Sequence, residues 1–419
     1  MKTKNKSLIF IIVLTIFSSL TFNMAHPVTP MFINKLGLPT FMFGLFFATM
    51  SIGNFIGSPF WGSLSDKKGR IKFLILGALG YGISQLGFGF NTNPFIILIF
   101  RFTGGFFVVS YLTTSMAYLT DVTTKENRVK YITYYSAANT IGSAMGSLLG
   151  GVIGNNNFKY TFFTQFILCV ILGILVFLLL EEPLKEKISI SNSLKHEKVN
   201  YSQFLNKNLI IMLIIIIAFY FASTSYNSSI NYYIEDVLKL SPTFIGGFMA
   251  FTGVLGFIIN LIFTPLLAKF FKEINIFKVI TFCISISLAL MVISNNVILF
   301  LTCAVIFTSF ASIHIPLQQS IITKLSKGNY GSLMGIFNSS KAVGQVTGSL
   351  LAGFIFDLGN KLPFLISSII ILISFIILLA STILTALASA KIYRLGTLMY
   401  GNPIKLRNAL KWFKKEKIS

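Results

Sequence analysis

Long apolar runs, separated by short polar or turn-rich segments, recur along the whole chain. A helix needs roughly 20 mostly apolar residues to cross the hydrocarbon core of a bilayer. The pattern predicts an all-α membrane protein with twelve transmembrane helices. They cover residues 8–33, 40–64, 73–90, 94–119, 131–153, 161–180, 209–233, 243–268, 276–294, 297–322, 331–356 and 362–384.

The longest polar stretch in this pattern, residues 181–208, contains Pro183 and five lysines. Proline and clustered polar residues are typical of connecting segments. The sequence therefore predicts a six-helix bundle over 1–180, a cytoplasmic linker over 181–208, a second six-helix bundle over 209–384 and a basic amphipathic cytoplasmic tail over 385–419.

The two predicted bundles resemble each other in sequence. ANTIGSAMGSLLGGVI from Ala138 aligns with SKAVGQVTGSLLAGFI from Ser340, and Pro-Thr-Phe occurs at 39–41 and again at 242–244. Repeats in the same order indicate two halves related by an axis along the membrane normal. We expect two pseudo-symmetric bundles that enclose a central cavity.

Composition and charge agree with a membrane protein. The chain is 54% hydrophobic, 11% charged and has a mean hydropathy of +0.79. Its net charge of +22 could indicate a nucleic-acid partner, but 28 of the 34 Lys and Arg residues fall in segments on one predicted side. This asymmetry follows the positive-inside rule and predicts that both termini are cytoplasmic, with no nucleic-acid partner. We expect a multi-pass protein of the cell membrane, surrounded by membrane lipid and monomeric.

Three short motifs resemble those of the major facilitator superfamily, and within it the twelve-helix drug:proton antiporters. GSPFWGSLSDKKGRIK is similar to the loop motif of that family, RFTGG to its arginine motif at Arg101 and Gly105, and GSAMGSLLGG to its antiporter motif, except that Ser147 stands where the family usually has proline. The resemblance implies a bacterial secondary active transporter that works by alternating access, most simply a multidrug-type efflux antiporter. It also implies a small-molecule substrate, proton as the coupling ion and no cofactor.

The loop motif and its surroundings form a predicted gating group, composed of Gly62, Asp66, Gly69, Arg70, Asp121 and Arg128. Asp66 is expected beside the start of helix eleven, near Gly331, because a helix N-terminus favours a carboxylate. Arg70 is expected to pair with Asp121. The alternative is a merely solvated, positively charged turn.

Glycines spaced by four residues predict close contacts between helices. Gly142, Gly146 and Gly150 form a groove on one helix face, and Gly151 belongs to the same motif. Gly344 and Gly348 are their counterparts in the second half. Small residues let transmembrane helices approach closely, whether for packing alone or for movement.

All twelve acidic residues map to loops or helix ends, whereas several basic or amide side chains fall inside predicted spans. Because polar groups in a membrane are costly, each is a candidate for the substrate or proton cavity. The candidates are His26, Arg101, Asn139, His314, Gln318, Asn338, Lys341 and Gln345. Lys341 lies about 15 Å beyond Gly331, near the midplane, facing either the cavity or a helix interface. With Arg101 and Lys341 as the charges within the spans, the cargo is expected to be neutral-amphipathic or anionic.

No phosphate-binding loop, HExxH motif or paired membrane carboxylate occurs, so the chain is not expected to be an enzyme. Cys169, Cys283 and Cys303 lack metal-ligand spacing, and no metal site is expected. The alternatives to efflux are an uptake symporter for a sugar or organic anion, a lipid or glycolipid flippase, and a non-transporting membrane sensor.

Overall fold

The structure is a computed structural model that describes residues 2–124, 127–183, 207–325 and 330–398, and these residues are helical apart from short connections. The N-terminal half, residues 2–183, contains α1 (Lys2–Asn23), η1 (His26–Val28), α2 (Thr29–Lys35), α3 (Met42–Lys68), α4 (Ile71–Phe90), α5 (Pro94–Val122), α6 (Arg128–Gly154) and α7 (Phe158–Leu179). The C-terminal half, residues 207–398, contains α8 (Lys207–Tyr232), η3 (Tyr233–Val237), α9 (Pro242–Ile258), η4 (Ile259–Phe263), α10 (Thr264–Phe270), α11 (Glu273–Ile293), α12 (Val297–Leu325), α13 (Tyr330–Leu358) and α14 (Leu362–Leu398).

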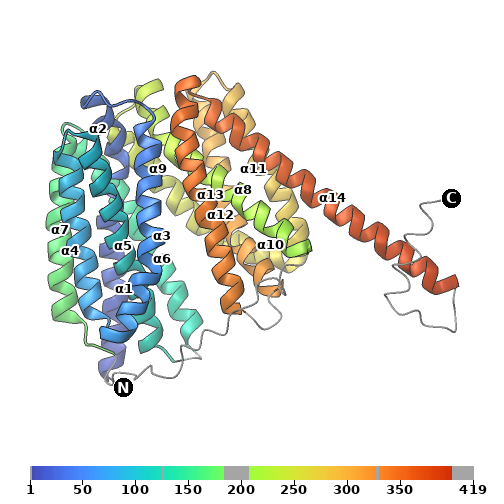
Figure 1. Cartoon of the computed structure of the whole chain (residues 1–419), viewed down its shortest axis with the longest axis horizontal. Coiled ribbons are helices and arrows are strands. Elements are labelled where there is room, and N and C mark those ends of the chain that lie inside the picture. Colours follow the sequence, from blue (N-terminus) through green and yellow to red (C-terminus); the bar gives the residue numbers. More distant parts are fainter. Residues whose placement is uncertain (1, 125–126, 184–206, 326–329, 399–419) are drawn as a thin grey trace.

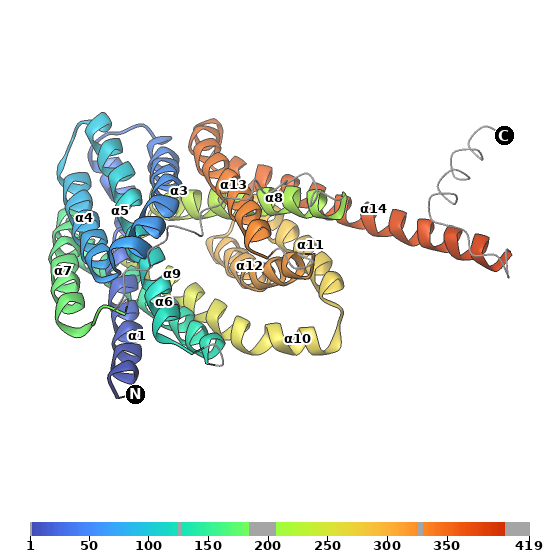
Figure 2. The same ribbon diagram turned by 60° about the horizontal axis from the view of Figure 1, so that its bottom comes forward.

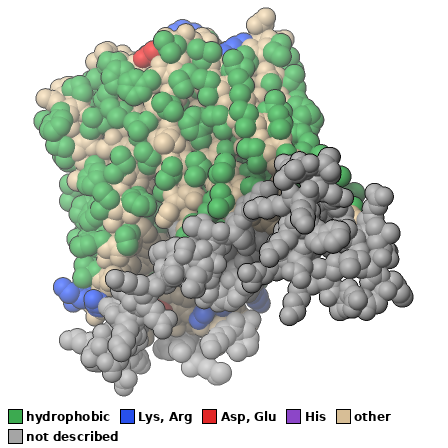
Figure 3. Space-filling view, turned by 45° about the vertical axis from the view of Figure 1, so that its right-hand side comes forward, with side chains coloured by type: hydrophobic (Ala, Val, Ile, Leu, Met, Phe, Trp, Pro, Cys, Tyr) green, Lys and Arg blue, Asp and Glu red, His purple; other side chains and the backbone are tan. Residues whose placement is uncertain are grey.

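Ten helical segments in the described part of the chain are long and apolar enough to cross a membrane. Helices α6 and α13, with 27 and 29 residues, have the necessary length but are rich in Gly, Ser, Thr and Asn. Figure 3 shows hydrophobic side chains over most of one lateral face, with Lys and Arg at its edges. The protein is a multi-pass membrane protein, because such an apolar lateral surface is compatible with lipid rather than water.

The two halves lie side by side, with α1–α7 on the left of Figure 1 and Figure 2 and most of α8–α14 on the right, while α9 reaches over to α6. Within the N-terminal half, α1 packs on α6, α5 on α3 and α4, and α4 on α7. Within the C-terminal half, α8 packs on α13 and α14, and α11 on α12 and α14. The halves contact each other mainly through α6 against α9 and α3 against α13. We call the side on which α1 begins the proximal side and the opposite side the distal side.

Four glycines bring the halves into backbone contact on the distal side. A Cβ atom added to Gly353 of α13 would lie 2.5 Å from the carbonyl oxygen of Phe41, and one added to Gly44 of α3 would lie 2.8 Å from the Gly353 nitrogen. On the other side of the interface, Gly151 of α6 lies against the Pro242 carbonyl, and Gly246 of α9 against the Ser147 carbonyl. We call these four glycines the distal clasp. Any side chain at these positions would push the two halves apart.

Local sequence explains where several helices begin. Asn93 precedes Pro94, and its side chain accepts a hydrogen bond from the Phe95 amide at 2.9 Å. Ser241 precedes Pro242 and caps α9 in the same way through the Phe244 amide. An Asn or Ser cap followed by proline is a strong helix start, because proline lacks the amide proton that would remain unpaired there.

Helix α14 continues to Leu398, beyond residue 384 where the last predicted span ends. The sequence has no proline between Pro363 and Pro403, so nothing in it terminates the helix at the membrane surface. The first residues of the predicted tail are therefore helical. Residues 399–419, which include the predicted amphipathic segment, lie outside the described residues.

Candidate functional site

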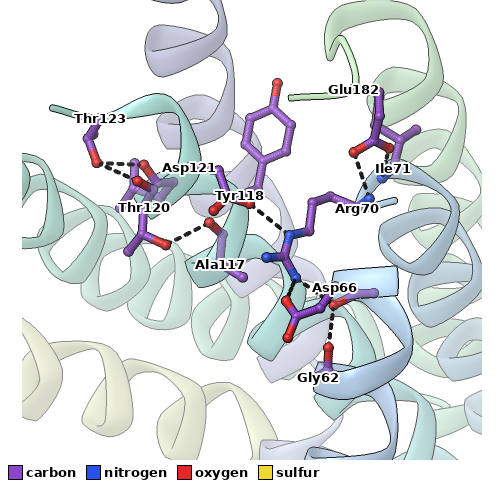
Figure 4. A network of polar contacts seen from close by, with 12 residues as sticks. Gly62, Asp66, Arg70, Ile71, Ala117, Tyr118, Thr120, Asp121, Thr123 and Glu182 are labelled. Carbon is purple, nitrogen blue, oxygen red and sulfur yellow. Dashed lines mark hydrogen bonds and ion pairs between the residues drawn. The ribbon is translucent and has the colours of Figure 1, made fainter. Parts of the chain in front are cut away.

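Arg70 lies at the centre of a polar network on the proximal side of the N-terminal half (Figure 4). Its Nε donates a hydrogen bond to Asp121 Oδ2 at 2.8 Å, and its Nη1 donates to Ser65 Oγ at 2.8 Å and forms an ion pair with Asp66. Burial of Arg70 opposes its charge, but the hydrogen bonds and charges of Asp121 and Asp66 outweigh burial, so its pKa is raised. The network ties the end of α3 and the start of α4 to the end of α5.

Glu182, at the start of the linker, joins the same network from the other side. Its two carboxylate oxygens accept hydrogen bonds from the backbone amides of Arg70 and Ile71, at 2.9 and 3.1 Å. The carboxylate therefore caps the N-terminus of α4, where the helix dipole favours negative charge. Gly69 allows this approach, because it has a φ of 98° and because a Cβ atom there would lie 2.7 Å from Glu182 Oε2.

The other predicted gating residues lie near this network. Arg128, at the start of α6, donates through Nη2 to the Thr120 carbonyl near the end of α5, at 3.3 Å. A Cβ atom at Gly62 would meet no atom within 4 Å. The side chains around Gly331, where the sequence suggested a second partner for Asp66, lie outside the described residues.

The C-terminal half carries an ion pair of opposite polarity at the repeat-related positions. Glu273, at the start of α11, pairs with Lys324, near the end of α12, with a distance of 2.7 Å between Lys324 Nζ and Glu273 Oε1. Both residues lie 203 positions after Arg70 and Asp121 respectively. The basic Arg70 thus corresponds to the acidic Glu273, and the acidic Asp121 corresponds to the basic Lys324.

The predicted glycine groove of α6 faces α1. Cβ atoms added to Gly142, Gly146 and Gly150 would collide with successive carbonyl oxygens of α1, those of Ile16, Leu20 and Met24. The spacing of four matches on both helices, so the two backbones lie in contact over about two turns. In the C-terminal half, Gly344 and Gly348 of α13 lie in the same way against Ile217 and Phe221 of α8. Gly151 does not share this face, since it belongs to the distal clasp.

A cavity of about 520 Å³ lies between the two halves. Its described lining combines hydroxyl, amide and aromatic side chains with one imidazole, and it includes no Asp, Glu, Lys or Arg. The lining residues from the N-terminal half are Asn23, His26, Phe47 and Ser51. Those from the C-terminal half include Tyr220, Ser223, Thr224, Asn227, Asn231, Phe248, Thr252, Phe307, Ser312 and Gln345. A cavity of this volume accommodates a molecule of drug size.

Two of the predicted cavity residues lie close together in the N-terminal half. His26 lines the cavity, and its ring stacks on Phe47 with 5.7 Å between the centroids. Arg101 is 4% exposed, and its guanidinium lies 3.8 Å from the centroid of Phe88 and within electrostatic range of His26. No carboxylate among the described residues pairs with Arg101, and its Nε is buried without a hydrogen-bond partner there.

On the opposite wall, Gln345 lines the cavity one turn after Lys341 on α13. The ammonium of Lys341 lies 5.1 Å from the centroid of Tyr220, whose side chain also lines the cavity. Lys341 therefore lies next to a ring that lines the cavity, and Asn338 is an exposed residue of α13.

The remaining predicted cavity residues lie elsewhere. His314 is sandwiched between Phe219 and Phe277, with centroid distances of 4.1 and 4.4 Å, and its Nε2 lies 3.1 Å from Thr281 Oγ1. Gln318, one turn later on α12, is fully buried. Asn139 accepts a hydrogen bond from Ser19 Oγ at 2.9 Å and thereby joins α6 to α1.

Two features were missed at the level of sequence. Ser223, Thr224, Asn227 and Asn231 form a polar stripe on the cavity face of α8, and their spacing of three and four residues was visible in the sequence. Glu235, in the π-helical turn η3, lies against Met31 and Asn34 of α2, and its Oε2 is buried without a partner among the described residues. No sequence signal pointed to Glu235, because a helix-end acid is usually solvated.

The sequence model of the Major Facilitator Superfamily matches residues 11–332 and 276–391. "Multidrug resistance protein 2" of Bacillus subtilis (strain 168) is 25% identical over 382 residues, which cover 88% of this chain and 94% of the relative. "Quinolone resistance protein NorA" of Staphylococcus aureus (strain COL) is 23% identical over 360 residues, which cover 85% and 91% of the two chains.

Solved structures of transporters share the fold. A bacterial homologue of the human lysosomal transporter Spinster, in an inward-facing and occupied conformation, has a TM-score of 0.77 at 11% identity and covers 91% of this chain and 97% of its own. A D-xylose–proton symporter has a TM-score of 0.71 at 14% identity, with 89% and 96% covered. At these identities the likeness concerns the fold alone.

Proposed function

The chain belongs to the Major Facilitator Superfamily, and from this we propose that it exports small molecules across the cell membrane in exchange for protons. The relatives named for multidrug and quinolone resistance support efflux, at 23–25% identity. The single observation that carries the proposal is the position of the cavity. It lies between two halves that touch through the distal clasp, as a transport site in an alternating-access protein must.

The proposal includes twelve transmembrane helices in two pseudo-symmetric bundles, with α6 and α13 as the two less apolar spans. Both have the length of a span, and each packs along a neighbouring apolar helix, α1 or α8. A helix sheltered by neighbours can carry the Ser, Thr and Asn side chains that a lipid-exposed helix could not. With both termini cytoplasmic, the distal side is the outside of the cell, and the conformation described here is closed to the outside.

We assign the Arg70 network a role in the conformational equilibrium rather than in cargo binding. Asp66, Arg70 and Asp121 lie at the proximal ends of α3, α4 and α5, and none of them lines the cavity. A group that binds no cargo can alter transport by favouring one conformation over another.

For the proton, His26 is the titratable imidazole in the described lining of the cavity. Histidine is the side chain whose intrinsic pKa suits proton exchange near neutral pH. Glu235 is a second candidate, since its partly buried carboxylate bridges the two halves on the distal side.

The test is transport by the purified protein in liposomes whose interior is more acidic than the exterior. An antiporter accumulates cargo inside as protons leave, whereas a symporter with the same cargo depletes it. Collapse of the gradient with nigericin should abolish accumulation. Movement of cargo in the same direction as protons would overturn the antiport proposal and support uptake.

An uptake symporter is the second candidate, favoured by one observation. The cavity lining offers amide and hydroxyl groups together with aromatic rings, and such a lining also suits a neutral, hydrogen-bonding solute such as a sugar. Sugars, organic anions and labelled phospholipids belong in the same flux assay, so that symport and lipid flipping are tested beside efflux. A protein that binds a cargo but moves none would be a sensor.

A further inference from the structure

Basic groups flank the central cavity from both halves, and the described lining contains no acid to balance them. Arg101 lies within electrostatic range of the cavity-lining His26, and Lys341 lies over the cavity-lining Tyr220. In the described residues, ion pairs with carboxylates are made by Arg70, Lys239 and Lys324, and by neither of these two. Charges of one sign around a cavity of low dielectric constant create a potential that attracts the opposite sign.

Lys341 is the better placed of the two for direct contact with cargo. It is only partly buried, and it lies one turn from Gln345 on α13, whose side chain lines the cavity. A lysine has four flexible carbons, so its ammonium can turn past the edge of the Tyr220 ring without movement of the backbone. Arg101, at 4% exposure, is held behind the cavity wall and acts through its field.

Several of the cavity-lining aromatic rings that could attract a cationic cargo are already paired. Lys341 lies over Tyr220, His26 stacks on Phe47, and Tyr226 packs on Phe307 with 4.2 Å between the centroids. A cargo cation would have to displace Lys341 from the electron-rich face of Tyr220, and it would then meet the ammonium in the same space.

We propose that the cargo binds as an organic anion, with its acidic group near Lys341, Tyr220 and Gln345 and its apolar or aromatic body along the cavity wall. The polar stripe of α8, from Ser223 to Asn231, runs about 12 Å along this wall and provides hydrogen-bond partners for the rest of the molecule. Any carboxylate or sulfonate of suitable size has the required chemistry. This inference rests on the proposed transport function, because it names the substrate class of the same cavity.

The experiment compares three fluorescent probes that share one aromatic body and differ in charge. Dansylglycine is an anion, dansylamide is neutral and dansylcadaverine is a cation. Their dissociation constants are measured by fluorescence titration of the purified full-length protein in lipid nanodiscs, without any ion gradient. We expect dansylglycine to bind more tightly than dansylamide, and dansylamide more tightly than dansylcadaverine.

Variants then assign the preference to Lys341. Lys341→Met should weaken dansylglycine by about tenfold, the effect of losing one charge-assisted hydrogen bond, and change dansylamide less than about twofold. Lys341→Arg should keep the order of the three probes. The matched control is Lys269→Met, which removes an exposed lysine that lies 5.9 Å from the centroid of Phe270 and outside the cavity. This control should leave all three constants unchanged.

Equal or tighter binding of dansylcadaverine by the wild type would overturn the proposal. So would a Lys341→Met variant that retains its melting temperature and binds all three probes like the wild type. Because the titration uses no gradient, a failure of proton exchange in liposomes would leave the result standing. Loss of the anion preference would conversely leave proton-coupled transport of another cargo intact.

Discussion

Arg70 connects three segments that are far apart in the sequence, since its side chain contacts Asp66 and Asp121 and its backbone amide contacts Glu182. The guanidinium is largely buried, so its charge depends on these two acids for compensation. Removing one partner of a buried ion pair destabilises the folded protein more than removing one partner of a solvent-exposed pair. The charge that remains is then buried without a counter-charge.

We predict that Asp121→Asn destabilises the protein by about 1–3 kcal/mol and slows transport, because Arg70 loses a charged acceptor. The dissociation constant for cargo should change less than about twofold, since Asp121 does not line the cavity. Lys324→Gln is the matched control, because it breaks the repeat-related pair at a lysine whose side chain is 65% exposed. Such exposed pairs contribute only about 0–1 kcal/mol. Melting curves and binding titrations on both variants check the prediction, and equal effects would contradict it.

Glu235 lies where the halves meet on the distal side, against Met31 and Asn34, with Asp236 beside it and Lys35 on the opposing helix. A buried acid oxygen without a donor is more easily accommodated when it is protonated. Opening of the distal side would hydrate this carboxylate, so its ionised form favours opening and its protonated form favours closure.

The reporter for this effect is a disulfide between cysteines introduced at Phe41 and Phe354, whose rings stack 5.2 Å apart across the two halves. The yield is expressed relative to that of a cysteine pair at Phe282 and Phe375 within the C-terminal half, which corrects for the loss of reactive thiolate at low pH. With Glu235 intact, we expect this relative yield to rise as pH falls from about 8 to about 5, because protonation of Glu235 favours the closed distal side. Glu235→Gln should give a high relative yield that no longer depends on pH. Asp236→Asn is the control, since Asp236 already pairs with Lys239 at 3.5 Å. A pH response that survives in Glu235→Gln would rule this assignment out.

At the scale of elements, the close contacts of α6 with α1 depend on the absence of side chains. A Cβ atom at Gly146 would collide with the Leu20 carbonyl, a backbone atom that cannot move without the helix. Gly247 of α9, in contrast, has no atom within 4 Å of the position that a Cβ would take.

We predict that Gly146→Ala destabilises the protein by about 1–3 kcal/mol, the usual cost of overpacking a close contact. Gly247→Ala should be neutral or stabilising by up to about 1 kcal/mol, because alanine favours a helix more than glycine does. Thermal melting of both variants in the same detergent provides the measurement. A Gly146→Ala variant as stable as Gly247→Ala would show that α1 can shift away from α6 at little cost.

The sequence predicted elements better than it predicted which face of an element carries the site. Membrane helices and the loop motif are recognised locally, so the family and the transmembrane nature were within reach. The direction in which a side chain points depends on packing that lies outside its own helix. His314 was a candidate for the cavity because of its type and depth, yet it lies between Phe219 and Phe277. The polar stripe of α8 was overlooked, because Ser, Thr and Asn are tolerated in membrane helices for packing as well as for binding.

At the scale of the whole molecule, the two sequence echoes meet at the interface between the halves. Gly151 of α6 lies against Pro242, and its counterpart Gly353 of α13 lies against Phe41. Each copy of the glycine-rich repeat therefore contacts a copy of the Pro-Thr-Phe repeat. The same kind of contact is thus made twice across the interface. Under the proposed alternating access, both contacts must separate when the distal side opens.

We therefore predict that locking one of these contacts stops transport. The cysteines at Phe41 and Phe354 are introduced after Cys169, Cys283 and Cys303 have been replaced, and the disulfide is formed with copper phenanthroline. Binding of cargo should survive, because the cavity lies between the halves while the distal side is closed, whereas flux in liposomes should fall by at least about tenfold and recover on reduction. The control joins Phe282 to Phe375, whose rings lie 4.8 Å apart within the C-terminal half, and it should form without loss of flux. Undiminished flux through the protein joined at 41 and 354 would mean that the halves need not separate on the distal side, and the alternating-access mechanism would then have to be abandoned.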